Sequence, residues 1–282
     1  MKKLSVIVPC YKQEQTICED IISIETVLKQ IRFDYELIVV VDGFLDRSYE
    51  EAVQLSSDHV KVVGYKVNRG KGYAVRFGMA ISTGDLIAFI DGGMDLNPNG
   101  LSMLLEHMEW YNADIIIGSK RHPVSQVYYP PLRRLYSIVY QIMVFFLFGL
   151  KVRDTQVGLK VFRREVLADI MPRLLVKRFA FDVEMLSVAH RLGYKRIFEA
   201  PVHLTHHFKS SINRRAIINM IIDTAAIFYR LRLLHYYDNA NAEKWQAQPE
   251  LILKVINRHN ISETVLLQPK LERYEDTNFK LA

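Results

Sequence analysis

The sequence of 282 residues predicts an α/β protein with a mostly parallel sheet flanked by helices. The first observation is that strand and helix signals alternate, with short connections, from Leu4 to Gly118. The second is the unbroken apolar run of residues 86–90, because strands of a parallel sheet are buried on both faces. The third is that polar loops follow the strands, where ligands bind in such sheets.

The elements of this first part follow from apolar spacing and helix-start signals. Residues 16–31 carry apolar side chains at helical spacing, and Pro98-Asn99 is typical of a helix start. We expect strands at residues 4–8, 35–41, 60–65, 86–90 and 113–118, and helices at residues 16–31, 48–56, 71–82 and 98–111.

The pattern changes after Gly118. Residues 120–131 predict a loop, and the nearly all-apolar residues 135–150 predict either a core helix or an interfacial helix that meets lipid. Further on we expect a mixed region at 153–205, with a helix at 182–192 and a strand near 196–200, then a basic amphipathic helix at about 214–235, a polar linker at 239–250 and a tail at 251–282.

Composition narrows the partners and the compartment. Cys10 and Cys18 lack metal-ligand spacing and indicate a reducing compartment without disulfides. The net charge of +6 favours anionic partners, and because no nucleic-acid motif accompanies it, we expect no nucleic acid. Residues 135–150 are fewer than the roughly 20 that cross a bilayer. We therefore expect a cytoplasmic protein that is at most peripheral on the cytoplasmic face of a membrane.

Side chains able to bind a phosphorylated ligand follow several strands. Asp91 and Asp95 lie beyond the apolar run and suggest a divalent cation that holds a phosphorylated ligand. In residues 68–72, glycines permit close approach, and Lys71 at a helix start favours anions. Asp42 is a candidate acceptor for hydrogen bonds from a nucleobase or ribose. Each motif alone is typical of an ordinary turn. Together at one sheet edge, they predict a nucleoside diphosphate bridged to the protein by a metal ion.

Five motifs in this order resemble family 2 glycosyltransferases of the Rossmann-like GT-A fold. The resemblance runs from about residue 4 to residue 235. It is greatest for the branch of dolichyl-phosphate mannose synthases and bacterial polyprenyl-phosphate hexose transferases. The motifs are VIVPCY at 6–11, VVDG at 40–43, NRGKG at 68–72, FIDGG at 89–93 and DTQVGLK at 154–160.

The resemblance implies site residues for catalysis, for the donor and phosphates, and for Mg²⁺ or Mn²⁺. The implied residues are Asp91, Asp154 and Arg134 for catalysis, Pro9, Tyr11, Gln13, Asp42, Lys71, Gly72, Lys120 and Arg133 for donor and phosphate binding, and Asp91 with Asp95 for the metal.

The chain departs from the family pattern in three motifs. Lys12-Gln13 stands where the family usually has Asn-Glu, and Val41-Asp42-Gly43 stands for Asp-Asp-Gly. Asp91-Gly92-Gly93 stands for Asp-x-Asp, which removes one expected metal ligand, and we expect Asp95 to supply the missing oxygen.

The resemblance implies inverting transfer of a hexose from a UDP- or GDP-sugar to a polyprenyl phosphate such as dolichyl or undecaprenyl phosphate. A phosphate acceptor is already anionic, whereas a hydroxyl acceptor needs a carboxylate base, for which Asp154, Asp182 and Glu184 are candidates. The alternatives are therefore transfer to a glycan or glycolipid hydroxyl, or a nucleotide-sugar-binding protein without catalysis.

The resemblance also divides the chain by role. Residues 1–118 form the nucleotide-sugar half, residues 119–238 form the acceptor half, and residues 239–282 form a tail of unassigned role. Arginines 133, 134, 214, 215, 230 and 232 favour contact of the acceptor half with an anionic membrane surface. A second copy or a membrane-anchored partner is compatible with this division.

Overall fold

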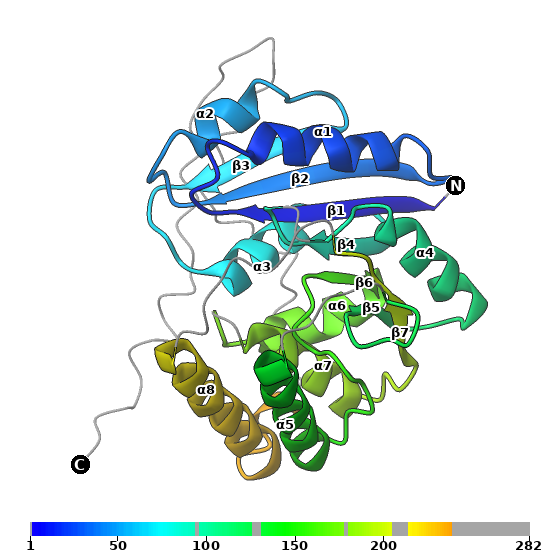
Figure 1. The fold of residues 1–282 in the computed structure, drawn as a ribbon, viewed down its shortest axis with the longest axis vertical. Coiled ribbons are helices and arrows are strands. Elements are labelled where there is room, and N and C mark those ends of the chain that lie inside the picture. The colour runs from blue at the N-terminus through cyan, green and yellow to red at the C-terminus, as the bar shows by residue number, and fades with distance from the viewer. Residues whose placement is uncertain (1, 94–95, 126–130, 178–179, 205–213, 239–282) are drawn as a thin grey trace.

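A seven-stranded sheet crosses the molecule in the order β3-β2-β1-β4-β6-β5-β7 (Figure 1). The computed structural model describes residues 2–93, 96–125, 131–177, 180–204 and 214–238. The strands are β1 (Lys3–Cys10), β2 (Asp34–Asp42), β3 (Val60–Tyr65), β4 (Leu86–Ile90), β5 (Ile115–Ser119), β6 (Leu159–Arg163) and β7 (Ile197–Pro201).

The sheet is mostly parallel, as the sequence predicts. Strands β1 to β5 and β7 run in one direction, and β6 lies antiparallel between β4 and β5. The carboxyl ends of β1 to β5 and the amino end of β6 therefore share one edge of the sheet, here called the carboxyl edge. All five residues of β4 are buried, which explains its unbroken apolar run.

Strand β6 was missing from the sequence prediction. It has five residues, and Lys160 interrupts its apolar pattern although that side chain is fully buried. A short strand with a charged residue inside gives no clear periodicity. Through β6 the sheet includes strands from both predicted halves of the chain.

Helices cover both faces of the sheet. Figure 1 shows α1 and α2 on one side of β1 to β3 and α3 on the other. The predicted bounds differ from the observed ones by a few residues at the ends, where helices fray. The helices are α1 (Ile17–Leu28), α2 (Ser48–Val53), α3 (Lys71–Ile81), α4 (Gly100–Trp110), α5 (Pro131–Phe148), α6 (Arg164–Ile170), α7 (Phe181–Arg191) and α8 (Arg214–Arg232), with 3₁₀ turns η1 (Met171–Arg173) and η2 (Tyr236–Asp238).

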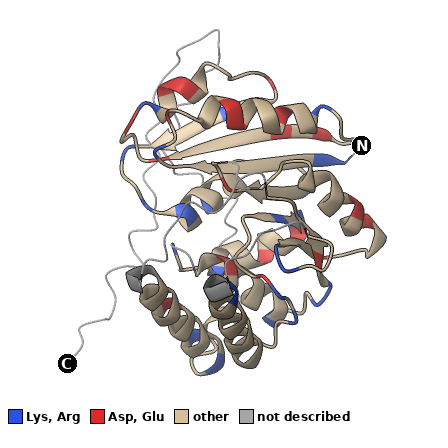
Figure 2. Ribbon diagram, viewed as in Figure 1, with Lys and Arg blue, Asp and Glu red and all other residues tan. Residues whose placement is uncertain are grey.

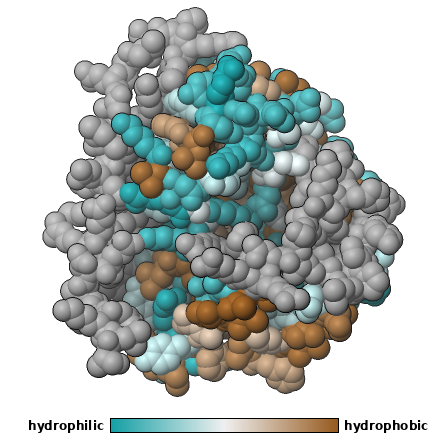
Figure 3. All heavy atoms as spheres, turned by 60° about the vertical axis from the view of Figure 1, so that its left-hand side comes forward, coloured by the Kyte–Doolittle hydropathy of each residue, from teal (hydrophilic) through white to brown (hydrophobic). Residues whose placement is uncertain are grey.

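Helices α5 and α8 lie side by side at one end of the molecule (Figure 1). The hydroxyls of Tyr140 and Thr224 are 2.9 Å apart, and the rings of Phe148 and Phe228 are 6.4 Å apart. Figure 3 shows apolar residues gathered on the surface at this end, and Figure 2 shows mostly uncharged residues along α5. Within the described residues, neither these helices nor any other has the length and apolar character to cross a membrane.

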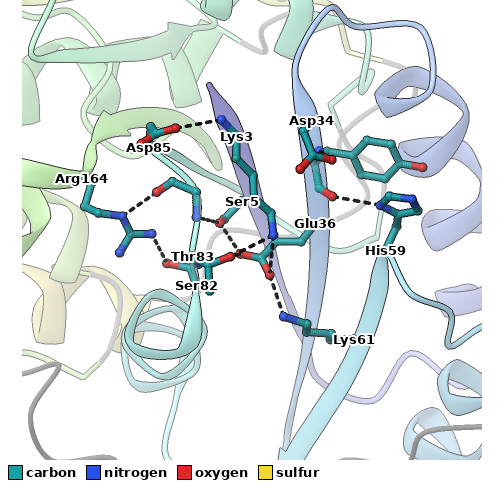
Figure 4. Close-up of polar contacts among 12 residues, drawn as sticks. Lys3, Ser5, Asp34, Glu36, His59, Lys61, Ser82, Thr83, Asp85 and Arg164 are labelled. Carbon is teal, nitrogen blue, oxygen red and sulfur yellow. Dashed lines mark hydrogen bonds and ion pairs between the residues drawn. The ribbon is translucent and has the colours of Figure 1, made fainter. Parts of the chain in front are cut away.

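A buried carboxylate joins the strands at the opposite, amino-terminal edge of the sheet (Figure 4). Glu36 of β2 accepts hydrogen bonds from Ser5 Oγ at 2.6 Å, from the Thr83 backbone N–H at 2.6 Å and from Lys61 Nζ at 2.8 Å. Burial alone would raise the pKa of Glu36, but these donors outweigh it and lower the pKa to about 2. This cluster is a structural clamp far along the strands from the carboxyl edge.

Candidate active site

The loop after β1 holds Gln13 firmly. Its backbone N–H donates to Ser48 Oγ at 2.7 Å, and its carbonyl accepts from the N–H groups of Thr16 and Ile17. The amide oxygen Oε1 is buried, and no donor among the described residues reaches it. Tyr11, also predicted to bind the donor, is 48% exposed on the same loop, as expected for a residue awaiting a ligand.

Asp42 at the end of β2 shapes the loop after β3. Its carboxylate accepts hydrogen bonds from Tyr65 Oη at 2.8 Å, Asn68 Nδ2 at 2.8 Å, and the backbone N–H groups of Arg69 at 2.7 Å and Gly70 at 2.9 Å. These four donors fill the acceptor positions of a carboxylate. The structure thus gives Asp42 a positioning role, and its contact with a nucleoside stays a prediction.

Four alternating charges run from the carboxyl edge into the core. Asp91 Oδ1 lies 2.7 Å from Lys71 Nζ, which lies 3.5 Å from Asp182 Oδ2. The other oxygen of Asp182 lies 2.6 Å from Lys160 Nζ. The exposed fraction of these side chains falls along the row, from 38% at Asp91 to 0% at Lys160. Lys71 therefore contacts the predicted metal ligand Asp91 directly.

The neighbouring charges in this row set the pKa values of its two middle side chains, Lys71 and Asp182. Burial alone would raise the pKa of Asp182, but the ammonium groups of Lys160 and Lys71 outweigh it and hold the pKa below its usual value. Burial likewise would lower the pKa of Lys71, but Asp182 and Asp91 raise it above its usual value. Both side chains are therefore charged at neutral pH, and the Asp182 carboxylate is paired with the ammonium groups of Lys71 and Lys160.

Glu184, two residues after Asp182 on α7, is enclosed by the protein. It accepts hydrogen bonds from Tyr237 Oη at 2.7 Å and from the backbone N–H groups of Leu175 and Val176, and its exposed fraction is 0%. Burial raises its pKa above the usual value. Glu184 thus anchors the chain after α8 and has no access to a substrate in this structure.

Asp154 and Lys120 come together beside β5. The backbone N–H of Lys120 donates to Asp154 Oδ2 at 3.2 Å, and that of Gln156 donates to Asp154 Oδ1 at 3.3 Å. Asp154 is 8% exposed and, unlike Asp182, faces no cation at ion-pair distance among the described residues. The structure therefore brings both predicted residues to the carboxyl edge.

Two glycines allow close packing at this edge. A Cβ on Gly158 would lie 2.1 Å from Asp91 Oδ2, and the Gly158 carbonyl accepts from the Asp91 N–H at 2.8 Å. A Cβ on Gly72 would lie 2.8 Å from the ring of Phe181. Gly72 therefore packs against α7, and its predicted contact with the donor stays a prediction.

The remaining predicted residues are only partly placed. Pro9 is the second-to-last residue of β1, close to the Gln13 loop at the carboxyl edge. Arg134 is exposed in the first turn of α5. Asp95 and the side chain of Arg133 lie outside the described residues.

Sequence reasoning missed two buried charges, Lys160 and Asp20. Asp20 of α1 is 2% exposed, and its Oδ2 accepts from the backbone N–H of Gly93 at 2.8 Å. Burial raises the pKa of Asp20, against the effect of this hydrogen bond. The sequence does indicate their burial, because both charged residues stand within apolar patterns. Asp20 lies at helical spacing with Ile17, Ile21 and Ile24.

The oxygen atoms near Asp91 fit a hydrated divalent cation. No three His, Cys, Asp or Glu side chains gather as a metal site within the part of the chain that the structure describes. That part does offer the Asp91 carboxylate and the unpartnered Oε1 of Gln13, both hard oxygen ligands. Mg²⁺ commonly binds one or two protein oxygens and keeps several waters. Asp91 and Gln13 would thus suffice together with a diphosphate.

Comparison with known proteins shows the family of this chain. The family model of Glycosyl transferase family 2 matches residues 5–171. A dolichyl-phosphate beta-glucosyltransferase from Dictyostelium discoideum is 32% identical over 248 residues, which are 82% of this chain and 75% of that protein. The Homo sapiens protein of the same name is 34% identical over 209 residues, and the match covers 67% of this chain and 63% of that protein.

Solved structures share the fold at low sequence identity. Glucosyl-3-phosphoglycerate synthase from Mycobacterium tuberculosis, in complex with Mn²⁺, UDP and phosphoglyceric acid, has a TM-score of 0.60 at 20% identity over 81% of this chain and 78% of that one. Mannosyl-3-phosphoglycerate synthase from Rubrobacter xylanophilus has a TM-score of 0.65 at 16% identity over 86% of this chain and 77% of that one. Fold, motif order and family match agree: this chain belongs to glycosyl transferase family 2 and has the GT-A fold.

Proposed function

We propose that this protein transfers a hexose from a nucleoside diphosphate sugar to the phosphate of a polyprenyl lipid, with inversion at the anomeric carbon. The relatives named above act on dolichyl phosphate by their names, which supports this acceptor class. Their names also specify a β-glucosyl product. Because UDP is the nucleotide in the Mycobacterium complex, we infer UDP-glucose as the donor to test first.

The names of the relatives carry the acceptor assignment, and the occupation of two candidate bases supports it. A hydroxyl acceptor must lose a proton as it attacks, so it needs a free carboxylate or similar base. Asp182 is held by Lys71 and Lys160, and Glu184 is enclosed, which leaves Asp154 as the one of the three candidates that could serve a hydroxyl acceptor. A phosphate oxygen is already anionic at neutral pH and needs positioning, which arginine and lysine side chains supply. We assign that role to Lys120, Arg133 and Arg134.

On the donor side, the charge that develops on the departing diphosphate must be offset. A bound Mg²⁺ or Mn²⁺ would supply this electrostatic stabilisation when held by Asp91 and Gln13. Lys71 contacts Asp91 and is the first residue of α3. The start of a helix also favours a bound anion. We infer that Pro9, Tyr11 and the Asp42 loop hold the nucleoside.

The lipid end of the acceptor matches the surface of α5 and α8. Val139 and Phe146 of α5 are 57% and 78% exposed, and Ile222 of α8 is 59% exposed. Residues 131–148 include no Asp or Glu, and two arginines stand in the first turn. Such helices bind at the boundary between headgroups and acyl chains. We propose that this face rests on the membrane that holds the acceptor.

A transfer assay with labelled donors tests the function. Purified protein is incubated with UDP-[¹⁴C]glucose or GDP-[¹⁴C]mannose, Mn²⁺ and either dolichyl phosphate, undecaprenyl phosphate or the unphosphorylated alcohol. We expect label in a glycolipid only with a phosphorylated acceptor, and from UDP-glucose. Transfer to the alcohol or to a glycan would contradict the phosphate assignment. Donor binding with no product from any acceptor would instead indicate a non-catalytic binder.

A further inference from the structure

Two positions where this sequence departs from the family pattern touch each other. Gln13 stands where the family usually has Glu, and Gly92-Gly93 stands where it has x-Asp. A Cβ on Gly92 would lie 2.4 Å from Gln13 Oε1, and a Cβ on Gly93 would lie 3.3 Å from Gln13 Nε2. The amide of Gln13 therefore occupies the space beside this loop that side chains at positions 92 and 93 would enter.

The backbone of Gln13 is held by its neighbours. Both backbone polar groups of Gln13 are hydrogen-bonded, so the loop after β1 cannot shift without breaking them. On the other side, the Gly93 N–H is held by Asp20 at 2.8 Å, which fixes the Gly93 backbone at a φ of 85°. The Gln13 side chain thus lies beside the residues that directly follow Asp91, which the hydrogen bond to Asp20 holds in place.

The amide oxygen lacks a partner in this setting. Oε1 of Gln13 is buried, and no donor of the described residues bonds to it. A buried carbonyl oxygen without a donor is costly and therefore rare in native proteins. A cation or a ligand hydroxyl would supply the missing partner.

We propose that Gln13 Oε1, together with Asp91, is an oxygen ligand for the divalent cation that accompanies the donor diphosphate; Asp95 lies outside the described residues, and its role as a further ligand stays a prediction. This inference rests on the proposed function and deepens it. Asp91 is neutralised by Lys71, and Gln13 is uncharged, so the described site holds little net negative charge for a free cation. The cation should therefore bind together with the nucleotide rather than before it.

The test measures Mn²⁺ binding directly, by the EPR signal of free Mn²⁺ in titrations of the full chain with and without UDP. Gln13→Met keeps the length of the side chain and removes the oxygen. The matched control is Gln15→Met, an exposed glutamine of the same loop. In the presence of UDP we expect Gln13→Met to weaken Mn²⁺ binding by at least about tenfold. Gln15→Met should match the unmodified chain.

A second variant keeps an oxygen at the same position. Gln13→Glu replaces the amide by a carboxylate of the same shape and leaves Gly93, whose φ of 85° disfavours any side chain, unchanged. We expect Gln13→Glu to bind Mn²⁺ in the presence of UDP at least as tightly as the unmodified chain. UDP affinity in EDTA should be the same in Gln13→Met, Gln15→Met and the unmodified chain, and thermal unfolding shows that each variant folds.

The outcomes separate the two proposals. Unchanged Mn²⁺ affinity in Gln13→Met would overturn the ligand assignment while UDP binding and lipid glycosylation persist. A loss of UDP affinity in EDTA would overturn it too, because Oε1 would then serve a hydroxyl of the nucleoside. If the unmodified chain binds neither UDP nor GDP, the proposed function itself fails.

Discussion

Each charge in the row Asp91, Lys71, Asp182 and Lys160 is offset by a neighbour of opposite sign. Burying an ion is expensive, and the cost is met only when its partners are close. The inner pair illustrates this, since Lys160 and Asp182 are almost completely buried and 2.6 Å apart. The row holds Lys71 in place and, through it, the Asp91 carboxylate at the carboxyl edge.

Lys160→Met should destabilise the fold strongly. It leaves Asp182 buried with only the more distant Lys71, and removing one partner of a buried pair typically costs about 3–5 kcal/mol. Urea unfolding measures the loss. The double variant Lys160→Met, Asp182→Leu should recover much of it, because no unpaired charge then remains in the core. Equal stability of the unmodified chain and Lys160→Met would contradict this account.

Asp91→Asn should lower the rate of transfer by at least about a hundredfold, because the carboxylate proposed to hold the cation is lost. Initial rates in the labelled-donor assay measure the effect. Asp85→Asn is the matched control: Asp85 lies just before β4, at the far end of the same strand, and is exposed. A comparable loss in both variants would show that the effect is not specific to the carboxyl edge.

At the scale of elements, α5 and α8 form a pair that is buried on one side only. Val144 and Phe148 of α5 are buried, while Leu135, Val139 and Phe146 are exposed. The two interpretations of residues 135–150, a core helix and an interfacial helix, thus apply to different faces of one helix. An apolar run alone does not reveal which of its faces the rest of the chain will cover.

Phe146→Ser should weaken binding to vesicles of anionic phospholipid by about tenfold or more, because burying an aromatic side chain in the interface contributes about 1.5–3 kcal/mol. Flotation of the protein with vesicles measures it. Trp110→Ser is the control, since Trp110 on α4 is 76% exposed and Phe146 is 78% exposed. If both variants float equally well, the α5 face does not contact lipid.

Sequence patterns located most elements because strands and helices depend on local periodicity. They failed at β6, where the pattern is short and Lys160 is buried by a partner from α7. They also did not predict the four hydrogen bonds that Asp42 accepts, three of which come from the loop after β3. Motifs show which residues gather at the carboxyl edge. Which of them bond to one another depends on contacts between distant segments.

Across the whole molecule, the two edges of the sheet have different tasks. The carboxyl edge gathers the candidate active site, and the amino edge is closed by the Glu36 clamp (Figure 4). The Glu36 cluster thus joins the strands at the end opposite the candidate active site.

The Glu36 clamp should make the free energy of unfolding depend on pH in the acid range. The pKa of Glu36 falls from 4.5 to about 2 on folding, so its contribution is complete above pH 4.5 and is lost as the pH falls toward 2. The shift corresponds to about 3 kcal/mol. Glu36→Gln should therefore be less stable at pH 7, and the difference should shrink at pH 3. Urea unfolding at both pH values measures it.

The control for this prediction is Glu50→Gln, which changes an exposed glutamate on α2. That variant should follow the unmodified chain at both pH values. A constant gap between Glu36→Gln and the unmodified chain from pH 7 to pH 3 would show that protonation of Glu36 does not govern the effect.

The antiparallel strand β6 has a consequence for how the protein is made. Strands β4 and β5 are not paired with each other, and β6, which joins them, is translated about 40 residues after β5. During translation, β4 and β5 therefore emerge from the ribosome before β6, the strand that pairs with both of them. Unpaired strand edges promote aggregation. The nascent chain must wait, exposed to chaperones, until residue 163 has left the exit tunnel and the two parts of the sheet can close.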